Sequence, residues 1–435
     1  MQYFRAGNKM SYPDTHYFRT MADNKERPAM IGNEECETLV IGAGLAGLTT
    51  ALELARQGHS VIVLEADSVG FGASGRNGGF VSPGYATGHD KIAGTVGEDS
   101  AKKLHMLSVE GMDFVQETIR DLNIASADPK HGLISVQRYE DAAALKAEVT
   151  ETKRDFNYDL EYMSREEVQS VLKSERYYQA VRDPKAFHIH PLNYARGLAQ
   201  EIERLGGRIY ESSASESIDV AGAQKVARTS RGSVRGKNLV IATGGYTGAL
   251  NKKLQRSYLP IATYVMVSEV APDLISEAIK TQAAIGDNRR AGDYYRLIEG
   301  GRRVLWGGRI TTRAASTEGL VRELRHEMTR TYPQLSQLKT ELAWSGLMAY
   351  ARHLMPQIGK MPNGVWYCTA FGGHGLNTTA IGGKIVSEAI LGTTDRYKLF
   401  EPFGLIWAGG YAGLAVAQLT YWKLQAQDKW RERSA

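Results

Sequence analysis

The sequence predicts an α/β (α+β) protein in which a discontinuous Rossmann-like domain is combined with a second domain built on an antiparallel sheet. A strand–helix–strand pattern runs from Leu39 to Asp67 and encloses a glycine-rich turn. Two later strand ends run into glycine pairs, "ATGG" and "AFGG". Between these pieces, aromatic and β-branched residues alternate with polar ones, which is typical of an antiparallel sheet with one open face.

The first elements follow from apolar spacing. Thr38–Ile41 and Ser60–Leu64 are β-branched runs that indicate buried strands, and Leu45–Ala55 between them has apolar residues at helical spacing. Gly58 follows that helix as a C-terminal cap would. Further along the chain we expect helices at 99–122, 140–156, 193–205, 318–330 and 380–391, and strands within 225–243, 258–310 and 365–372.

These elements divide the 435 residues into units of different type, and the chain is long enough for two or three domains. We expect it to leave the Rossmann-like domain twice and to return twice. The expected units are an extended N-terminal arm, 1–37; the Rossmann-like domain, 38–80, 190–250 and 355–400; a cap domain, 81–189 and 251–354; and a C-terminal helical tail, 401–435.

Composition excludes several classes of protein. The net charge is only +5 and the basic residues are scattered, which argues against a nucleic-acid partner. Cys36 and Cys368 lie far apart, so neither a metal site nor a disulfide framework is expected. The N-terminus has no basic region followed by an apolar run, so we expect no signal peptide and a cytoplasmic location.

One segment near the C-terminus is apolar enough to need an interpretation. Phe403–Trp422 contains 20 residues without a charge, a length that could just cross a bilayer. It also contains four glycines, a glutamine and a threonine. We therefore expect a buried or interface helix that begins near Tyr411, and a membrane contact through 403–422 stays open as the less favoured alternative.

A dinucleotide fingerprint lies at the first turn. Gly42, Gly44 and Gly47 form GxGxxG directly after a strand and at the start of a helix. These glycines allow a tight turn, close approach to a pyrophosphate and close helix–strand packing, and the helix N-terminus favours phosphate. Glu65 closes the second strand, where its carboxylate can bind a ribose diol and would repel a 2′-phosphate. The pattern therefore argues against NADP.

A second glycine-rich loop, "GFGASGRNGG" from Gly70 to Gly79, distinguishes between the remaining dinucleotides. Its backbone N–H groups and the guanidinium of Arg76 could surround a pyrophosphate. A nicotinamide enzyme has no evident need for this second contact, whereas a permanently held FAD does. "FGGHGLNTT" (Phe371–Thr379) then enters a helix whose positive N-terminus could stabilise a reduced flavin.

Several motifs together resemble those of one enzyme family. The motifs are "GFGASGRNGG", "FHIHPLNYARGLA" (187–199), "GDYYRL" (292–297), "MPQIG" (355–359) and "FGGHGLNTTAIGGKIVSEAI" (371–390). In this order the chain is similar to the FAD-dependent amine and amino-acid oxidases of the D-amino-acid-oxidase/glycine-oxidase superfamily, and most similar to the γ-glutamylputrescine oxidase group. The resemblance spans nearly the whole chain and implies FAD-dependent oxidation of a carbon–nitrogen bond.

The resemblance also implies which residues meet the cofactor, including Val226 at the adenine through its backbone. Covalent-flavin relatives carry a cysteine or histidine where this chain has Met348, Ala349 and "SGRNGG", so we expect non-covalent FAD. The implied cofactor residues are Gly42, Gly44, Leu45, Ala46, Gly47, Glu65, Ala66, Ser74, Gly75, Arg76, Asn77, Gly78, Gly79, Val226, Ala242, Thr243, Gly244, Gly373, His374, Gly375, Leu376 and Thr378.

The substrate side departs from the family pattern. Glycine-oxidase-like members carry an arginine soon after Trp-x-Gly that binds an α-carboxylate, and Met348 stands in that place here. A carboxylate without a bidentate partner binds poorly, although Arg352 or Arg296 could replace it. We expect the substrate pocket to include Tyr295, as the best candidate, together with Trp344, Met348, Tyr350, Arg352 and His374.

The predicted reaction is oxidation of a γ-glutamylputrescine-like or other polyamine-type amine to an imine. Hydrolysis would give an aldehyde and ammonia, and molecular oxygen as acceptor would give hydrogen peroxide. Alternatives are an oxidase or a membrane-associated, quinone-linked dehydrogenase of a cyclic or N-methylated amino acid such as pipecolate or sarcosine, and a non-catalytic FAD-binding protein. The sequence names no catalytic acid or base, since a neutral amine needs none, and it leaves the oligomeric state open.

Overall fold

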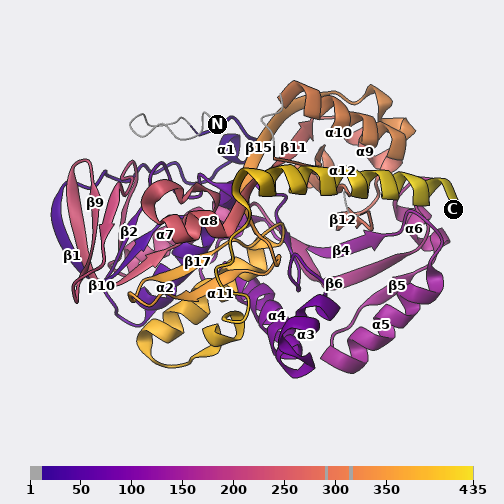
Figure 1. Ribbon diagram of the computed structural model, residues 1–435. Coiled ribbons are helices and arrows are strands. Elements are labelled where there is room, and N and C mark those ends of the chain that lie inside the picture. The colour runs from indigo at the N-terminus through magenta and orange to yellow at the C-terminus, as the bar shows by residue number, and fades with distance from the viewer. Residues whose placement is uncertain (1–11, 290–291, 313–316, 435) are drawn as a thin grey trace.

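Two sheets make up the framework of the molecule. The computed structural model describes residues 12–289, 292–312 and 317–434. The first sheet lies at the left of Figure 1 and the second at the right. The first has the strand order β16 (Gln357–Lys360), β17 (Trp366–Thr369), β10 (Gly232–Ile241), β1 (Gly32–Ile41), β2 (Val61–Leu64) and β7 (Arg208–Tyr210), with β8 (Ser217–Asp219) and β9 (Lys225–Thr229) joined beside β10.

The strands at the centre of the first sheet are parallel, so their carboxyl ends share one edge. Ile41 lies beside Ile241 on one side and beside Leu64 on the other. These strands are buried β-branched and leucine runs, as expected for a parallel sheet covered on both faces. The turns that follow β1, β2, β10 and β17 therefore meet at this edge, which is where open α/β sheets bind ligands.

The second sheet is antiparallel except where β12 runs parallel to β4. Its face follows the expected alternation, because Tyr294 and Arg296 point to one side and Tyr295 and Leu297 to the other. Its order is β15 (Thr340–Ala351), β11 (Tyr258–Ser268), β14 (Arg303–Thr311), β13 (Tyr294–Ile298), β12 (Ala284–Asp287), β4 (Lys130–Val136), β6 (Ala180–His188) and β3 (Phe80–Val81), with β5 (Glu161–Met163) beside β6.

Helices cover both sheets. In the first half of the molecule, α2 packs on α11 so closely that a Cβ at Gly383 would come within 2.7 Å of the Thr49 side chain. The helices are α1 (His16–Arg19), α2 (Leu45–Arg56), α3 (His89–Val96), α4 (Glu98–Asp121), α5 (Ala142–Phe156), α6 (Arg165–Val171), α7 (Pro191–Arg204), α8 (Lys252–Ser257), α9 (Pro272–Ala278), α10 (Thr317–Thr331), α11 (Gly375–Leu391) and α12 (Gly410–Ser434).

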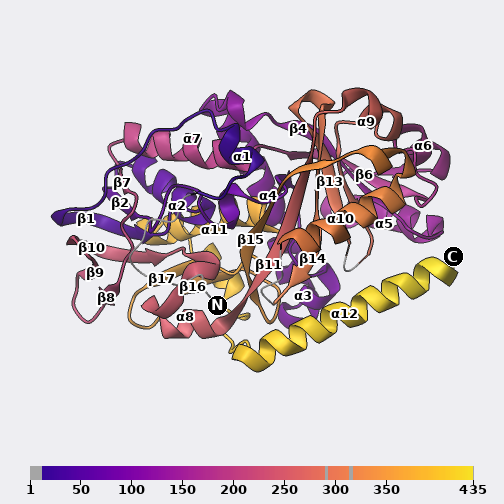
Figure 2. The same ribbon diagram turned by 90° about the horizontal axis from the view of Figure 1, so that it is seen from above.

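The beginning of the chain differs from the expected extended arm. Strand β1 begins at Gly32, inside the segment expected to be arm, because the polar run that precedes its apolar half pairs with β10. The described part of the arm, 12–31, includes the short helix α1 and buries Tyr17 completely. Figure 2 shows α1 lying beside α7, above the junction of the two halves.

The C-terminal segment forms the expected helix, which is not fully buried but packs on the body along one side. Helix α12 begins at Gly410 and runs along the outside of the second sheet (Figures 1 and 2). Gln418 and Tyr421 face the body, whereas Val416 and Leu419 are more than half exposed. Only one side of a surface helix can meet the sheet, so apolar residues on its other side stay in contact with solvent. Within the described residues, no helix is long and apolar enough to cross a membrane.

Candidate FAD site and substrate face

The first turn of the Rossmann-like unit requires its glycines. Gly42 has a φ of +106°, and a Cβ there would come within 2.7 Å of the Ala242 carbonyl oxygen. A Cβ at Gly47 would overlap the Gly42 carbonyl oxygen. Gly44 caps α2 without a side-chain hydrogen bond, and the N–H of Leu45 donates to Ser74 Oγ at 3.0 Å. The N-terminus of α2 thus opens toward the second glycine loop, as a pyrophosphate site would require.

Glu65 lies directly after β2, at the same edge. Its side chain is half-buried, and its carboxylate accepts hydrogen bonds from the N–H of Ala43, at 2.7 Å, and of Asp67, at 3.0 Å. Burial raises the pKa of Glu65 to about 7, against the lowering effect of these two bonds. A ribose diol would add donors to a carboxylate that is short of them, so the residue fits the adenosine half of FAD.

The loop Gly70–Gly79 is held by side chains from outside it. The carbonyl oxygens of Gly75, Arg76, Asn77 and Gly78 each accept a hydrogen bond, from Tyr12, Trp344, Tyr17 and Arg296 respectively. Within the loop, Asn77 Nδ2 donates to the Ala73 and Ser74 carbonyls, and Asn77 Oδ1 accepts from the Gly79 N–H. The loop therefore has a fixed shape.

The predicted role of the Arg76 guanidinium is not supported by its contacts. It donates to the Gly72 carbonyl at 3.3 Å, to the Ser345 carbonyl at 3.5 Å and to the Tyr246 hydroxyl at 3.0 Å. The guanidinium also lies over the Phe71 ring. These contacts direct it to the protein, so the expected donation to a pyrophosphate is corrected to a structural tie between the loop and β15.

The third glycine-rich turn leads into α11. His374 precedes this helix, and its Nε2–H donates to the carbonyls of Ser82, at 3.0 Å, and Pro83, at 2.9 Å. Burial lowers the pKa of His374, so the ring is neutral. The Thr378 hydroxyl donates to the His374 carbonyl. Gly375 faces open space, because no atom lies within 4 Å of a Cβ placed there.

One face of the second sheet looks toward these glycine loops. Trp344 contacts the second loop, Gly70–Gly79, through its indole N–H, at 2.9 Å from the Arg76 carbonyl, and Tyr350 contacts the third loop at Gly373. Met348 is on the same face, because alternate residues of a strand share a face. Gly346 between them is buried, yet no atom lies within 4 Å of a Cβ placed there. This space is where a ring and a substrate could stack.

Tyr294, not Tyr295, belongs to this face. A Cβ at Gly78 would come within 2.6 Å of the Tyr294 ring, which also covers Gly307. Tyr295 points to the opposite side, where it stacks on Trp306 and its hydroxyl bonds to those of Tyr177 and Tyr332. The prediction of Tyr295 as pocket lining is therefore wrong by one position. Because side chains alternate between the two faces of a strand, a shift of one residue places Tyr295 on the face away from the loops.

The two arginines considered for a carboxylate also lie elsewhere. Arg296 is buried, and its three nitrogens donate to the Gly78 and Ile189 carbonyls, to Tyr17 Oη and to His188 Nδ1. Arg352 is exposed in the turn after β15. Arg296 lies on the Tyr294 side of β13, but its donors are used within the protein, and Arg352 is exposed, so the expectation that one of them could replace the missing clamp is corrected.

Val226 lies far from the cofactor edge. It pairs with Arg235, six residues before the end of β10 at Ile241, which corresponds to about 20 Å of strand. The residues that do lie beside Glu65 are Ser212 and Ser213: the Ser213 N–H donates to the Glu65 carbonyl at 2.7 Å. The adenine contact expected of Val226 is therefore corrected. The segment after β7 (Arg208–Tyr210) lies there instead, and it carries no motif that marks a cofactor contact.

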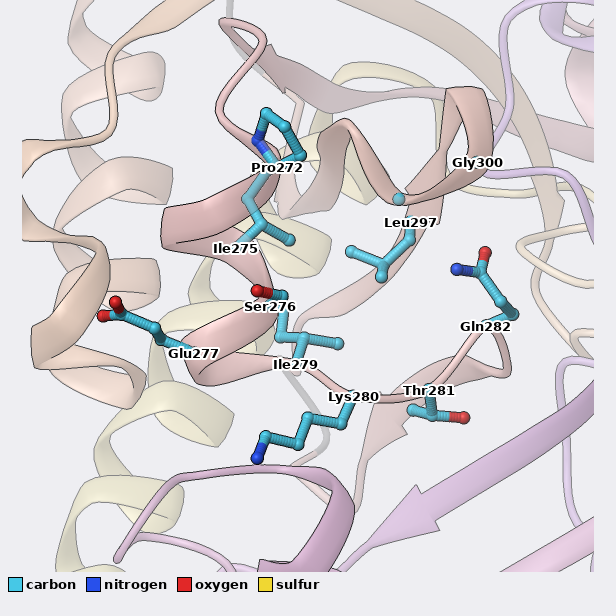
Figure 3. A pocket seen from close by; sticks show the side chains of 11 residues that line it. Pro272, Ile275, Ser276, Glu277, Ile279, Lys280, Thr281, Gln282, Leu297 and Gly300 are labelled. Atoms are coloured by element: carbon cyan, nitrogen blue, oxygen red, sulfur yellow. The ribbon is translucent and has the colours of Figure 1, made fainter.

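One cavity of the structure lies apart from this region. It encloses about 620 Å³ beside α9, and Ile275, Lys280 and Leu297 are among its lining residues (Figure 3). It shares no residue with the three glycine loops. The loops and the sheet face opposite them therefore remain the candidate site.

Comparison with known proteins identifies the family. Residues 37–389 match the family described as FAD dependent oxidoreductase (DAO). Because the match covers most of the chain, the protein belongs to this family. It is an FAD-dependent amine oxidoreductase that acts on CH–NH groups, with FAD as its cofactor.

Individual relatives agree with this assignment. The chain is 32% identical to gamma-glutamylputrescine oxidoreductase of Escherichia coli (strain K12) over 395 residues, or 90% of this chain and 92% of that protein. It is 31% identical to the probable oxidoreductase OrdL of Haemophilus influenzae, over 93% of this chain and 94% of that protein. The solved glycine oxidase of Geobacillus kaustophilus shares the fold, with a TM-score of 0.72 at 19% identity over 86% of this chain and 99% of that chain.

Proposed function

We propose that the protein oxidises the C–N bond of a γ-glutamylputrescine-like or other polyamine-type amine. One observation carries the proposal: the sheet face opposite the glycine loops presents Tyr294, Met348 and Tyr350, and the two nearby arginines are engaged or exposed. An α-carboxylate would have no bidentate partner there. The name of the 32% identical relative supports the same substrate class.

In the proposed overall reaction, one amine, one molecule of oxygen and one of water are converted to one aldehyde, one ammonia and one hydrogen peroxide. Bound FAD supplies the two-electron acceptor for hydride from the carbon next to nitrogen. The chain's own residues orient the amine and exclude charge. The aromatic rings of Tyr294 and Tyr350 offer apolar walls that favour the neutral amine, whose nitrogen lone pair must be available for oxidation.

The FAD is proposed to be non-covalent. The two cysteines lie on β1 and β17, and burial raises the pKa of the Cys368 thiol. His374 uses its Nε2–H to bond two carbonyls. Denaturation followed by ultrafiltration should therefore release all yellow colour into the filtrate; colour that stays with the precipitated chain would contradict non-covalent binding.

The test of the substrate is anaerobic reduction of the yellow protein by a panel of compounds. We expect γ-glutamylputrescine and related mono-acylated polyamines to bleach the flavin fastest, and glycine, sarcosine and pipecolate to be at least a hundredfold slower. Peroxide assayed on return to air would establish oxygen as acceptor. Faster bleaching by an amino acid than by every polyamine conjugate would reject the proposal.

A specific observation favours a second candidate for the acceptor. Val416 and Leu419 are exposed on α12, as a helix that touches a membrane surface would require. A quinone-linked dehydrogenase would be reduced by substrate but reoxidised slowly by oxygen and rapidly by a soluble quinone. The ratio of these two reoxidation rates distinguishes an oxidase from a dehydrogenase.

A further inference from the structure

The N-terminal arm contacts the loop Gly70–Gly79 through two tyrosines. Tyr17 Oη donates to the Asn77 carbonyl at 2.8 Å, and Tyr12 Oη donates to the Gly75 carbonyl at 3.2 Å and to the Gly70 carbonyl at 3.4 Å. Most of the arm precedes residue 37, where the family match begins. These hydrogen bonds join the arm to a loop about 60 residues away in sequence.

The arm is anchored in both halves of the molecule. Tyr17 is fully buried in a cluster that includes Leu192 of α7 and Val265 of β11. Arg19 pairs with Glu341 of β15 at 3.4 Å, and the Ala22 N–H donates to the Asn193 side chain at 2.9 Å. Residues 12–31 of the arm are therefore part of the packed structure.

A buried hydrogen-bond chain extends behind Tyr17. Arg296 Nη2 donates to Tyr17 Oη at 2.9 Å, and Arg296 Nη1 donates to His188 Nδ1 at 2.8 Å. His188 Nε2–H then donates to the Gln282 carbonyl at 2.8 Å. Burial lowers the pKa of His188 to about 3, so this chain keeps one protonation state across the working pH range.

The hydrogen bonds to the loop's carbonyl oxygens also fix the direction in which its N–H groups point. A peptide unit is planar and trans, so its N–H points away from its own C=O. With the carbonyls of residues 75–78 held by outside donors, the loop cannot turn these oxygens toward a phosphate. A loop that keeps carbonyls away from a bound anion presents N–H groups and a positive potential to it instead.

We propose that the arm is a cofactor-retention clasp, in which Tyr12 and Tyr17 hold the loop Gly70–Gly79 in its FAD-binding shape. The inference rests on the proposed contact between this loop and FAD. Arm docking and FAD binding are then coupled, and the coupling acts in both directions: the arm tightens FAD binding, and FAD tightens arm docking.

The first test measures FAD affinity of the full-length apoprotein by quenching of flavin fluorescence. Tyr17→Phe leaves the half-buried Asn77 carbonyl without its donor, and we expect the Kd for FAD to rise about tenfold; Y12F/Y17F should raise it further. Tyr158→Phe is the matched control, because it removes a buried hydroxyl that bonds to Asp183 in the cap sheet. Its Kd should stay within twofold of the wild-type value.

Ser74→Ala separates failure of the clasp from failure of the loop assignment. Ser74 belongs to the loop itself and accepts from the Leu45 N–H. If S74A raises the Kd and Y12F/Y17F raises it less than threefold, the loop meets FAD but the clasp is wrong. If neither variant changes the Kd, the loop assignment fails and the clasp with it. An equal rise of the Kd for FAD in Y158F also overturns the clasp, because loss of a buried hydroxyl that does not contact the loop would then weaken FAD binding just as much.

The second test uses the unaltered protein and stands even if the tyrosine variants fail to fold. Lys25 is exposed on an irregular segment of the arm, so trypsin cleavage after it reports arm undocking. We expect FAD to slow this cleavage at least fivefold, while cleavage at Lys429 of the exposed helix α12 stays unchanged. Equal cleavage at Lys25 with and without FAD overturns the clasp.

Discussion

Tyr350 of β15 lies against Gly373 of the turn before α11: a Cβ on Gly373 would come within 2.6 Å of the Tyr350 hydroxyl oxygen. A single bridge between Tyr350 and Phe371 joins the two segments at this point. The contact ties the substrate face of the second sheet to the loop that begins α11. Its spacing therefore sets the distance between the substrate face and the cofactor loop.

Gly373→Ala should disturb that spacing. The new methyl must push the rigid tyrosine ring away, which typically costs about 1–3 kcal/mol, and we expect kcat/KM to fall at least tenfold. Y350F/G373A should recover most of the loss, because without the hydroxyl the nearest ring atom is 3.7 Å from the methyl. Gly94→Ala, in open space on α3, is the control. A double variant as impaired as G373A would contradict the contact as the cause.

Glu65 predicts a pH dependence of FAD binding. Its folded-state pKa of about 7 is above the ordinary 4.5, so the FAD-free protein binds an extra proton between these values. The free energy of unfolding of that form should therefore fall by about 3 kcal/mol as pH rises from 4.5 to 7. Ribose hydroxyls that donate to the carboxylate favour its charged form, so FAD should bind about tenfold more tightly at pH 8 than at pH 6.

Glu65→Gln is the control for that assignment. The amide does not titrate, so the Kd for FAD measured by fluorescence should be equal at pH 6 and pH 8. A Kd in E65Q that still changes with pH as in the wild-type protein would assign the dependence to another group. Both proteins should be compared at one ionic strength, since FAD carries charge.

Met348→Arg should change the preferred substrate. The new guanidinium would enter a face whose one described arginine, Arg296, already donates to protein groups, and it could bind a carboxylate through two parallel hydrogen bonds. We expect kcat/KM for γ-glutamylputrescine to fall ten- to a hundredfold and that for sarcosine to rise. Met348→Leu keeps size and polarity and should stay within threefold of the wild-type enzyme. Unchanged relative rates in M348R would remove Met348 from the substrate face.

Tyr295→Phe tests the corrected position of that residue. Its hydroxyl bonds to Tyr332 at 2.6 Å and to Tyr177 at 3.1 Å in the cap core. Losing it should lower the free energy of unfolding by about 1–2 kcal/mol, measured by urea denaturation, with kcat within twofold of wild type. A large loss of kcat at unchanged stability would return Tyr295 to the pocket.

Local patterns predicted the turn at Gly42–Gly47 and the strand end at Glu65, because that geometry is local, while the contact of these residues with FAD stays a prediction. Gly42 and Gly47 are required by backbone approaches within one turn, and Glu65 lies where the second strand ends. The strand-rich middle was recognised from alternation, but the phase of β13 was not. A period of two says that neighbouring residues face opposite ways, and only packing against α10 and the glycine loops says which way each one faces.

The missed residues act across long sequence distances. Tyr12 and Tyr17 stand in a polar, aromatic stretch without periodicity, so nothing local connects them with the Gly70–Gly79 loop. The guanidinium of Arg76 was assigned to a phosphate from its neighbours in sequence, whereas its partner Ser345 is 269 residues away. Charge and hydrogen-bonding capacity are visible in a sequence, but the partner is not.

The sequence by itself determined the family, the cofactor and the parallel strand ends that meet at one edge, because turns, caps and strand phases are encoded by neighbouring residues. The tertiary structure alone decided which side chains face the cofactor edge. As an arginine, Arg296 could have bound a substrate carboxylate. In the fold it is buried behind Gly78, and its guanidinium donates to two carbonyls, a phenol oxygen and an imidazole nitrogen. A buried cation must satisfy its donors where it lies, and only the packed fold fixes that place.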